Sequence, residues 1–178
     1  IGIIARMQTH RHFSDFFAAV RRLIDAGENA HAIVIGRGTK QETVGFQPVR
    51  ELKLESHVHF PGFTDGDDYV GLLKACDATA YLVPGSDGTC RAVREAMAMG
   101  KPVVAADRGM LREIVADNET GLIFDNSADD LFSALHTLVT DRATTRTMGR
   151  AAREKAVADY SLGAQARAVR AVYESILK

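Results

Sequence analysis

A turn between a buried strand and a helix carries two acidic residues that could hold a ligand. The turn starts at Pro84-Gly85 and contains Asp87, and Glu95 lies eight residues after Asp87 on the helix that follows. Free backbone N–H groups and the helix dipole at such an N-terminus favour an anion. A carboxylate, in turn, accepts hydrogen bonds from two hydroxyls. The layout predicts a site for a phosphorylated sugar ligand.

Some residues of this turn and its helix suit a phosphate group, and others suit a sugar. Gly88 lets the backbone approach a ligand closely, and Thr89 and Cys90 stand where the free N–H groups are expected. Glu95 should lean back toward the helix N-terminus, where it would repel a phosphate but could accept from a ribose diol. The alternatives are a plain connecting turn and a solvent-exposed glutamate, and the apolar neighbours of Glu95 disfavour the second.

The loop after the first expected strand carries cations where a dinucleotide-binding fold has glycines. It reads RMQTHRH from Arg6 onward and lacks the G-x-G-x-x-G pattern, which disfavours a nicotinamide-dependent dehydrogenase. The guanidinium groups of Arg6 and Arg11 could instead bind phosphate oxygens through paired hydrogen bonds. Solvated surface arginines are the alternative, but the position at a strand exit in the centre of the sheet favours phosphate binding.

Histidines and cysteines give no independent site. His57 and His59 alternate along an expected strand and form at most half of a metal site, so no metal is expected. Cys76 and Cys90 lack the spacing of a metal or redox motif. We expect them to be reduced thiols of a cytosolic protein.

Short apolar runs that alternate with helical patterns predict an α/β fold. Six runs suit a doubly wound, parallel, Rossmann-like sheet with the strand order 3-2-1-4-5-6 and helices at the C-terminus. The first and fourth strands are then neighbours, so the loops that begin at Arg6 and Pro84 should face each other across one crevice. The expected strands cover residues 1–5, 32–35, 57–60, 78–83, 102–106 and 121–124.

Helical periodicity accounts for most of the remaining chain. Ser14 is expected to cap the first helix and Gly27 to end it. A polar helix ends near Leu54, and the last helix carries an apolar face. The other expected helices cover residues 67–74, 89–99, 111–116, 131–139, 142–159 and 162–176.

The composition is that of one globular domain over residues 1–178. The chain has 22 basic and 23 acidic residues, and this balance argues against a general nucleic-acid-binding protein. No apolar run approaches the roughly 18 residues needed to span a bilayer, and no signal peptide is visible. Because residues 1–5 already have the pattern of a core strand without an initiating Met, we expect the chain to be a piece of a longer protein.

Several motifs follow one another in an order typical of one enzyme family. Glu95 begins the run EAMAMGKPVV, GRG follows the second expected strand, and FPGF begins at the last residue of the third. Together with Arg6 and Arg11, these motifs resemble the C-terminal, nucleotide-sugar-binding domain of GT-B glycosyltransferases, specifically the family-4 (group 1) retaining enzymes. The resemblance covers essentially the whole chain.

The resemblance implies a role for each motif. Arg6 and Arg11 match the family's basic pair, whose second member is usually Lys. Asp87 and Glu95 match the family's two glutamates, of which the first faces the donor sugar and the second binds the ribose. Asp87 is one methylene shorter than the family's first acid. Further donor-binding positions are Gly36, Gly62, Phe63, Gly88, Thr89 and Cys90.

The implied reaction transfers a hexosyl group from a nucleotide diphosphate sugar to a sugar or lipid-linked acceptor, with anomeric retention. Arg6, Arg11 and the helix N-terminus would neutralise the departing diphosphate without a metal or other cofactor. The resemblance also implies that the N-terminal, acceptor-binding domain of the family is absent from these 178 residues. We therefore expect the present chain to bind the donor without efficient transfer.

The expected location is cytoplasmic, and any membrane contact is expected at the inner face, through the absent domain. The alternative to an enzyme half is a non-catalytic nucleotide-binding or interaction module on the same fold, for which Asp87 is the motivation.

Overall fold

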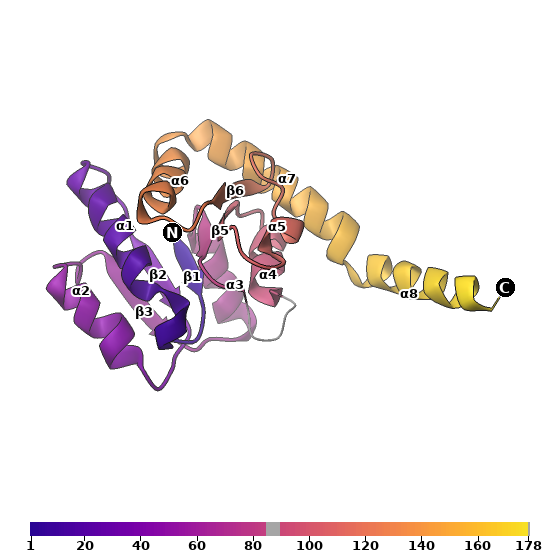
Figure 1. The fold of residues 1–178 in the computed structure, drawn as a ribbon, viewed down its shortest axis with the longest axis horizontal. Helices are drawn as coiled ribbons and strands as arrows, with labels where there is room; N and C mark the ends of the chain where they lie inside the picture. The colour runs from indigo at the N-terminus through magenta and orange to yellow at the C-terminus, as the bar shows by residue number, and fades with distance from the viewer. Residues whose placement is uncertain (85–89, 178) are drawn as a thin grey trace.

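Six parallel strands form one sheet in the order β3-β2-β1-β4-β5-β6 (Figure 1). The predicted doubly wound architecture is confirmed, with β1 and β4 as central neighbours. The structure is a computed structural model that describes residues 1–84 and 90–177. The strands are β1 (Gly2–Ile4), β2 (Ala32–Ile35), β3 (Val58–Gly62), β4 (Thr79–Tyr81), β5 (Val103–Ala106) and β6 (Gly121–Phe124).

Apolar side chains buried on both faces of the sheet explain why these segments form strands. All four residues of β5 are buried, and Val34 and Ala80 have no exposed surface. Strands that helices cover on both faces have continuous apolar sequences, which is why their positions were predictable. The prediction overestimates β4, which spans Thr79–Tyr81 rather than residues 78–83.

Helices cover both faces of the sheet (Figure 1). α1 (Phe13–Asp25) packs beside α6 (Ala128–Thr140), and α4 (Arg91–Ala98) packs beside α7 (Arg142–Tyr160) on the opposite face. Right-handed crossovers that run in opposite directions from the sheet centre place α1 and α4 on different faces. The remaining helical segments are a 3₁₀ turn (Thr9–Arg11), a π-helical turn (Glu42–Phe46), α2 (Gln47–Glu51), α3 (Gly66–Ala75), α5 (Leu111–Ile114) and α8 (Leu162–Ile176).

The start of α1 corrects one prediction. Ser14 is the second residue of the helix rather than its cap, and the cap position belongs to His12, whose backbone is left-handed with φ 56°. The earlier start places Phe13, which is 1% exposed, on the buried face of the helix. Burying an aromatic ring contributes about 2 kcal/mol or more, against about 1 kcal/mol for a serine cap, so the core decides the boundary. Gly27, with φ 89°, follows the end of α1 as predicted.

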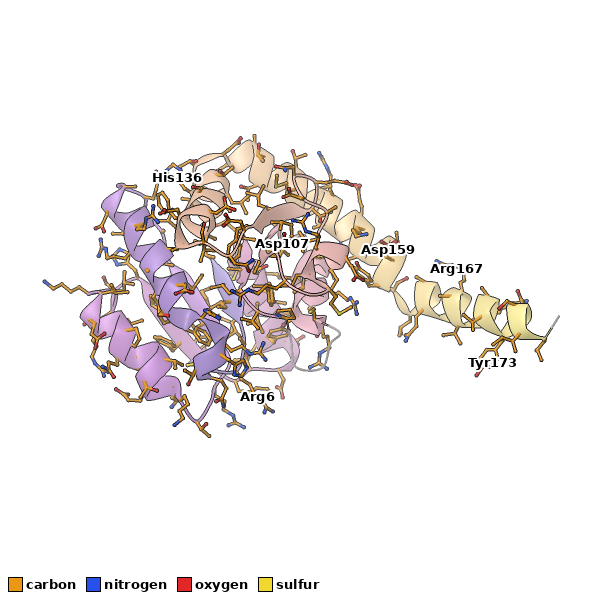
Figure 2. The ribbon with its side chains drawn as sticks, in the orientation of Figure 1. Arg6, Asp107, His136, Asp159, Arg167 and Tyr173 are labelled. Atoms are coloured by element: carbon orange, nitrogen blue, oxygen red, sulfur yellow. The ribbon has the colours of Figure 1, made fainter. Side chains whose placement is uncertain are left out.

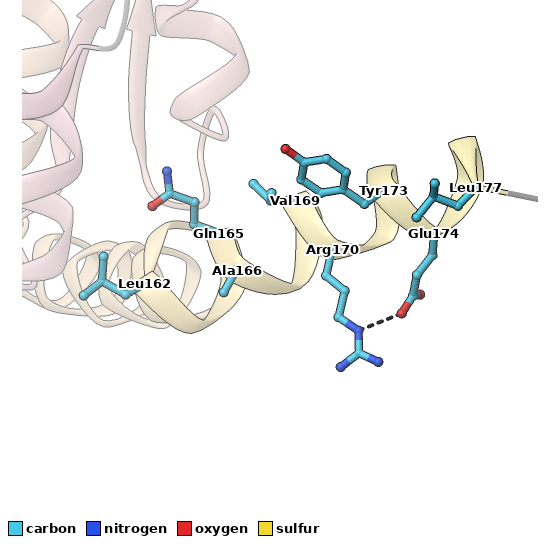
Figure 3. A pocket seen from close by; sticks show the side chains of 8 residues that line it. All are labelled: Leu162, Gln165, Ala166, Val169, Arg170, Tyr173, Glu174 and Leu177. Atoms are coloured by element: carbon cyan, nitrogen blue, oxygen red, sulfur yellow. Dashed lines mark hydrogen bonds and ion pairs between the residues drawn. The ribbon is translucent and has the colours of Figure 1, made fainter.

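α8 extends away from the rest of the domain (Figure 1). Among the described residues of α8 none is buried, and Leu162 is 85% exposed. Figure 3 shows Val169 and Tyr173 on this helix, and an ion pair between Arg170 and Glu174 at 2.6 Å. The amphipathic pattern correctly predicted the helix, and the structure adds that its apolar face is uncovered. Within residues 1–84 and 90–177, no helix is both long and apolar enough to cross a membrane.

Candidate functional site

The loops that follow β1 and β4 meet at the carboxyl edge of the sheet. Arg11 donates from Nη1 to the carbonyl oxygen of Pro84 at 2.9 Å, across the boundary between the two central strands. Its Nε atom is buried and has no hydrogen-bond partner among the described residues. The structure thus confirms that the loop after β1 meets the start of the β4 loop, and it holds the Arg11 guanidinium against Pro84.

Arg6 follows β1 and lies at the same edge, with its side chain exposed (Figure 2). Within the described parts of the chain, no hydrogen bond or ion pair links Arg6 to another side chain. The two members of the predicted basic pair therefore differ: Arg11 is anchored to the β4 loop, and Arg6 extends into solvent.

Glycines after β2 bring three strand exits close together. Gly36, with φ 137°, donates from its backbone N–H to the carbonyl oxygen of Gly62 at 2.8 Å. A Cβ atom on Gly36 would lie 2.3 Å from the oxygen of Ala5, and one on Gly38 would lie 2.2 Å from the oxygen of Met7. This backbone packing by itself requires glycine at both positions, and nucleotide binding by Gly36 and Gly62 stays a prediction.

An exposed aromatic ring marks the β3 side of this edge. Phe63 follows β3 and is 63% exposed. The guanidinium of Arg37, from the glycine turn after β2, lies 5.3 Å from the centre of the Phe63 ring, which is within the range of a cation–π contact. The pair joins the second and third strand exits, and donor binding by Phe63 remains a prediction.

α4 follows β4 along the chain and starts at Arg91 rather than at the expected residue 89. Cys90 precedes it with a left-handed backbone (φ 47°) and is buried, and its carbonyl oxygen accepts from the N–H groups of Val93 and Arg94. The N–H groups of Arg91 and Ala92, the first two residues of the helix, lack intrahelical acceptors and could receive an anion. Three predicted site residues, Asp87, Gly88 and Thr89, lie outside the described residues.

Two side chains contact the Glu95 carboxylate. The Tyr69 hydroxyl, from α3, donates to Oε2 of Glu95 at 2.6 Å, and Nε of Arg91 lies 3.3 Å from Oε1. The Glu95 side chain is 37% exposed, so the carboxylate faces both protein and solvent. Burial and the hydrogen bond to Glu95 raise the pKa of Tyr69 well above its usual value. The phenol is therefore protonated at neutral pH and acts as the donor.

Sequence reasoning missed two side chains near the site, Tyr69 and Arg108. Arg108 follows β5, donates from Nε to Asn126 at 2.6 Å, and lies 3.4 Å from Nε2 of His12 through its Nη1. The strand order already places the exit of β5 beside that of β4, so the order could have pointed to Arg108. No sequence signal pairs Tyr69 with Glu95, because that contact joins two helices and residues that are 26 positions apart.

Three histidines cluster near the amino ends of β2 and β3, far from the arginine loops. His31 stacks on both His57 and His59, and its Nδ1 lies 3.2 Å from Nε2 of His59. Nδ1 of His57 is occupied by the Ser56 hydroxyl at 2.9 Å. Within the described residues, no group of three His, Cys, Asp or Glu side chains could hold a metal ion. His57 and His59 thus have His31 as a neighbour, but the three described side chains do not form a set of metal ligands.

A family model described as "Glycosyl transferases group 1" matches residues 1–155. Among curated proteins, "Putative glycosyltransferase YtcC" of Bacillus subtilis is 25% identical over 166 residues, covering 89% of this chain and 41% of that protein. "GDP-mannose-dependent alpha-mannosyltransferase" of Mycolicibacterium smegmatis is 32% identical over 164 residues, covering 89% and 38% respectively. The chain thus spans less than half the length of these relatives.

Solved structures show the same architecture. Anabaena Alr3699/HepE in complex with UDP has a TM-score of 0.84 and 25% identity, over 98% of this chain and 48% of that chain. The C-terminal domain of the group 1 glycosyl transferase LpcC from Francisella tularensis has a TM-score of 0.77 over 90% of this chain and 86% of that domain, at 22% identity. The second likeness concerns the fold alone.

Proposed function

Because the chain belongs to the family of glycosyl transferases group 1, as the sequence motifs predicted, we propose that it is the donor-binding half of a retaining glycosyltransferase. The whole protein would transfer a hexosyl group from a nucleotide diphosphate sugar to a sugar or lipid-linked acceptor. The observation that carries the proposal is the Arg11–Pro84 hydrogen bond, since it fixes a cation at the carboxyl edge of the two central strands.

We propose that cations on one side of the site bind the diphosphate of the donor, and that a carboxylate on the other side binds its ribose. Arg6, Arg11 and the N-terminus of α4 would take the diphosphate through charge-assisted hydrogen bonds. Glu95 would accept from the ribose hydroxyls, and Phe63 would border the base. The similar Anabaena protein was crystallised in complex with UDP, and the mycobacterial relative is named for GDP-mannose. These two relatives support a nucleotide diphosphate and leave its base open.

Catalysis rests on stabilising the leaving group. The bond between the anomeric carbon and the β-phosphate oxygen breaks, and that oxygen keeps the electron pair. An acceptor hydroxyl forms the new bond to the anomeric carbon and passes its proton to the departing diphosphate. The cations and the helix N-terminus stabilise the charge that develops on the departing diphosphate, and we propose that no metal is needed. Asp87, carried over from the family pattern, would face the donor sugar.

The partner we propose is an N-terminal, acceptor-binding domain of the same protein. The uncovered face of α8 supports a second domain, because apolar patches that stay exposed usually mark an interaction surface. The domain alone would then bind the donor and transfer sugar poorly. We propose a cytoplasmic location, with peripheral membrane contact through the acceptor domain.

Calorimetric titration of the chain with UDP, GDP and ADP tests the donor-binding proposal. We expect saturable binding of at least one of them, and NADH serves as the control for a dehydrogenase. Absence of binding to all three at millimolar concentration would contradict the proposal, and tight binding of NADH would favour the dehydrogenase alternative. Turnover of a nucleotide sugar by the full-length protein separates the enzyme from a non-catalytic module.

A further inference from the structure

Tyr69 is the side chain that holds Glu95 in place. It comes from α3, is half-buried, and its hydroxyl lies 2.6 Å from Oε2 of Glu95. The other contact, from Nε of Arg91 to Oε1, is longer at 3.3 Å and comes from a side chain that is 81% exposed. Exposed ion pairs of this kind hold a carboxylate weakly, so Tyr69 accounts for most of the orientation of Glu95.

The geometry leaves part of the carboxylate free. A carboxylate offers about four lone-pair positions. The Tyr69 hydroxyl uses one on Oε2, and Arg91 makes only an ion pair with Oε1. Acceptor positions therefore remain on both oxygens, and the Glu95 side chain is 37% exposed. Two adjacent acceptors match a vicinal diol, whose hydroxyls can each donate to a different oxygen.

We propose that Tyr69 is a positioning residue that fixes the Glu95 carboxylate to receive the 2′- and 3′-hydroxyls of the donor ribose. The inference rests on the proposed function and adds a residue that the sequence motifs do not contain. Because the phenol uses one lone pair of Oε2, it limits how the carboxylate can rotate. The benefit is preorganisation, since a glutamate that is already oriented loses less side-chain freedom when the ribose binds.

The test compares Tyr69→Phe with the unaltered chain, using the best-bound of UDP, GDP and ADP together with the 2′,3′-dideoxy form of that nucleotide. Tyr69→Phe removes only the hydroxyl. We expect about tenfold weaker binding of the ribonucleotide, the scale of one hydrogen bond to a charged group. The affinity for the dideoxy nucleotide should change by less than about twofold, because this nucleotide lacks the hydroxyls that would donate to Glu95. Tyr173→Phe, on exposed α8, is the matched control and should change neither affinity.

Three outcomes would overturn the inference. Equal weakening of both nucleotides would mean that Tyr69 supports the fold of the site in general. Tighter ribonucleotide binding would mean that the phenol competes with the ribose for Glu95. Unchanged affinities would mean that Glu95 needs no positioning.

Glu95→Ala separates the inference from the proposed function. If the unaltered chain prefers the ribonucleotide and Glu95→Ala removes that preference, the ribose role of Glu95 stands. An unchanged preference in Tyr69→Phe then refutes the inference alone. If the unaltered chain shows no preference, or binds no nucleotide, the proposed role of Glu95 fails and the role of Tyr69 fails with it.

Discussion

The two sides of the proposed donor site are held in different ways. After β1, Arg11 is fixed by one bond to the backbone of Pro84, and Arg6 is exposed. On the α4 side, Glu95 is held by side chains from α3 and from its own helix. Coulomb attraction falls slowly with distance, so the exposed Arg6 can contribute to diphosphate binding without strict placement. Hydrogen bonds to a diol need narrow distances and angles, and the structure fixes the carboxylate accordingly.

Gly36→Ala should have the largest effect on the β1 side of the site, because it disrupts the backbone packing there. The new Cβ would lie 2.3 Å from the oxygen of Ala5, at a backbone φ of 137°. We expect a loss of about 3 kcal/mol in the free energy of unfolding, from strain and from the displaced β1 exit. Denaturant titration measures the loss. Gly71→Ala in α3 is the control and should be neutral or slightly stabilising, because the new Cβ would meet nothing within 4 Å beyond its chain neighbours and the adjacent backbone of its own helix. A Gly36→Ala chain as stable as the original would contradict the packing described for these loops.

Arg11→Ala should remove the anchored cation. We expect the affinity for a nucleoside diphosphate to fall by about 2 kcal/mol, or roughly thirtyfold, the scale of lost charge-assisted hydrogen bonds. The free nucleoside should bind nearly as before, because it has no phosphate. Calorimetry on both ligands makes the comparison, with Arg167→Ala on distant α8 as control (Figure 2). An equal loss for nucleoside and diphosphate would refute a phosphate role for Arg11.

Arg6→Ala should have a smaller effect that depends more on salt. An exposed cation contributes about 0.5–1 kcal/mol at low ionic strength, and this contribution fades as salt screens it. Titrations of the diphosphate at low and at high salt measure the difference between Arg6→Ala and the original chain. If Arg6→Ala weakens binding more than Arg11→Ala does, the contrast between an anchored and an exposed arginine is wrong.

Val172→Asp on α8 should have the smallest effect of all. The side chain is 58% exposed, so the free energy of unfolding of this domain should change by less than about 0.5 kcal/mol. The same substitution at Val93, which is 1% exposed in α4, should cost about 4 kcal/mol or more, because it buries an unpaired carboxylate. Thermal unfolding compares the two variants. A large loss at Val172 would mean that α8 packs against the domain.

The sequence predicted those features that depend on local pattern and on general rules of strand order. Apolar runs located the strands, the doubly wound order placed β1 beside β4, and this order brought Arg11 to Pro84. The cap of α1 was mispredicted because burial of Phe13 outweighs the local preference of Ser14.

Long-range contacts could not be predicted in the same way. The bond between Tyr69 and Glu95 depends on how α3 and α4 pack, which no local spacing encodes. The apolar face of α8 predicted a helix, but periodicity does not reveal what covers such a face. The roles of Asp87, Gly88 and Thr89 remain predictions outside the described residues.

A crystal structure of the chain with a bound nucleoside diphosphate would locate the donor site itself. We predict that the diphosphate lies within hydrogen-bond distance of the Arg11 guanidinium and the N-terminus of α4, with the ribose hydroxyls on Glu95. A nucleotide bound elsewhere, such as beside the histidines at the amino ends of β2 and β3, or bound with its ribose away from Glu95, would contradict this assignment of the donor site.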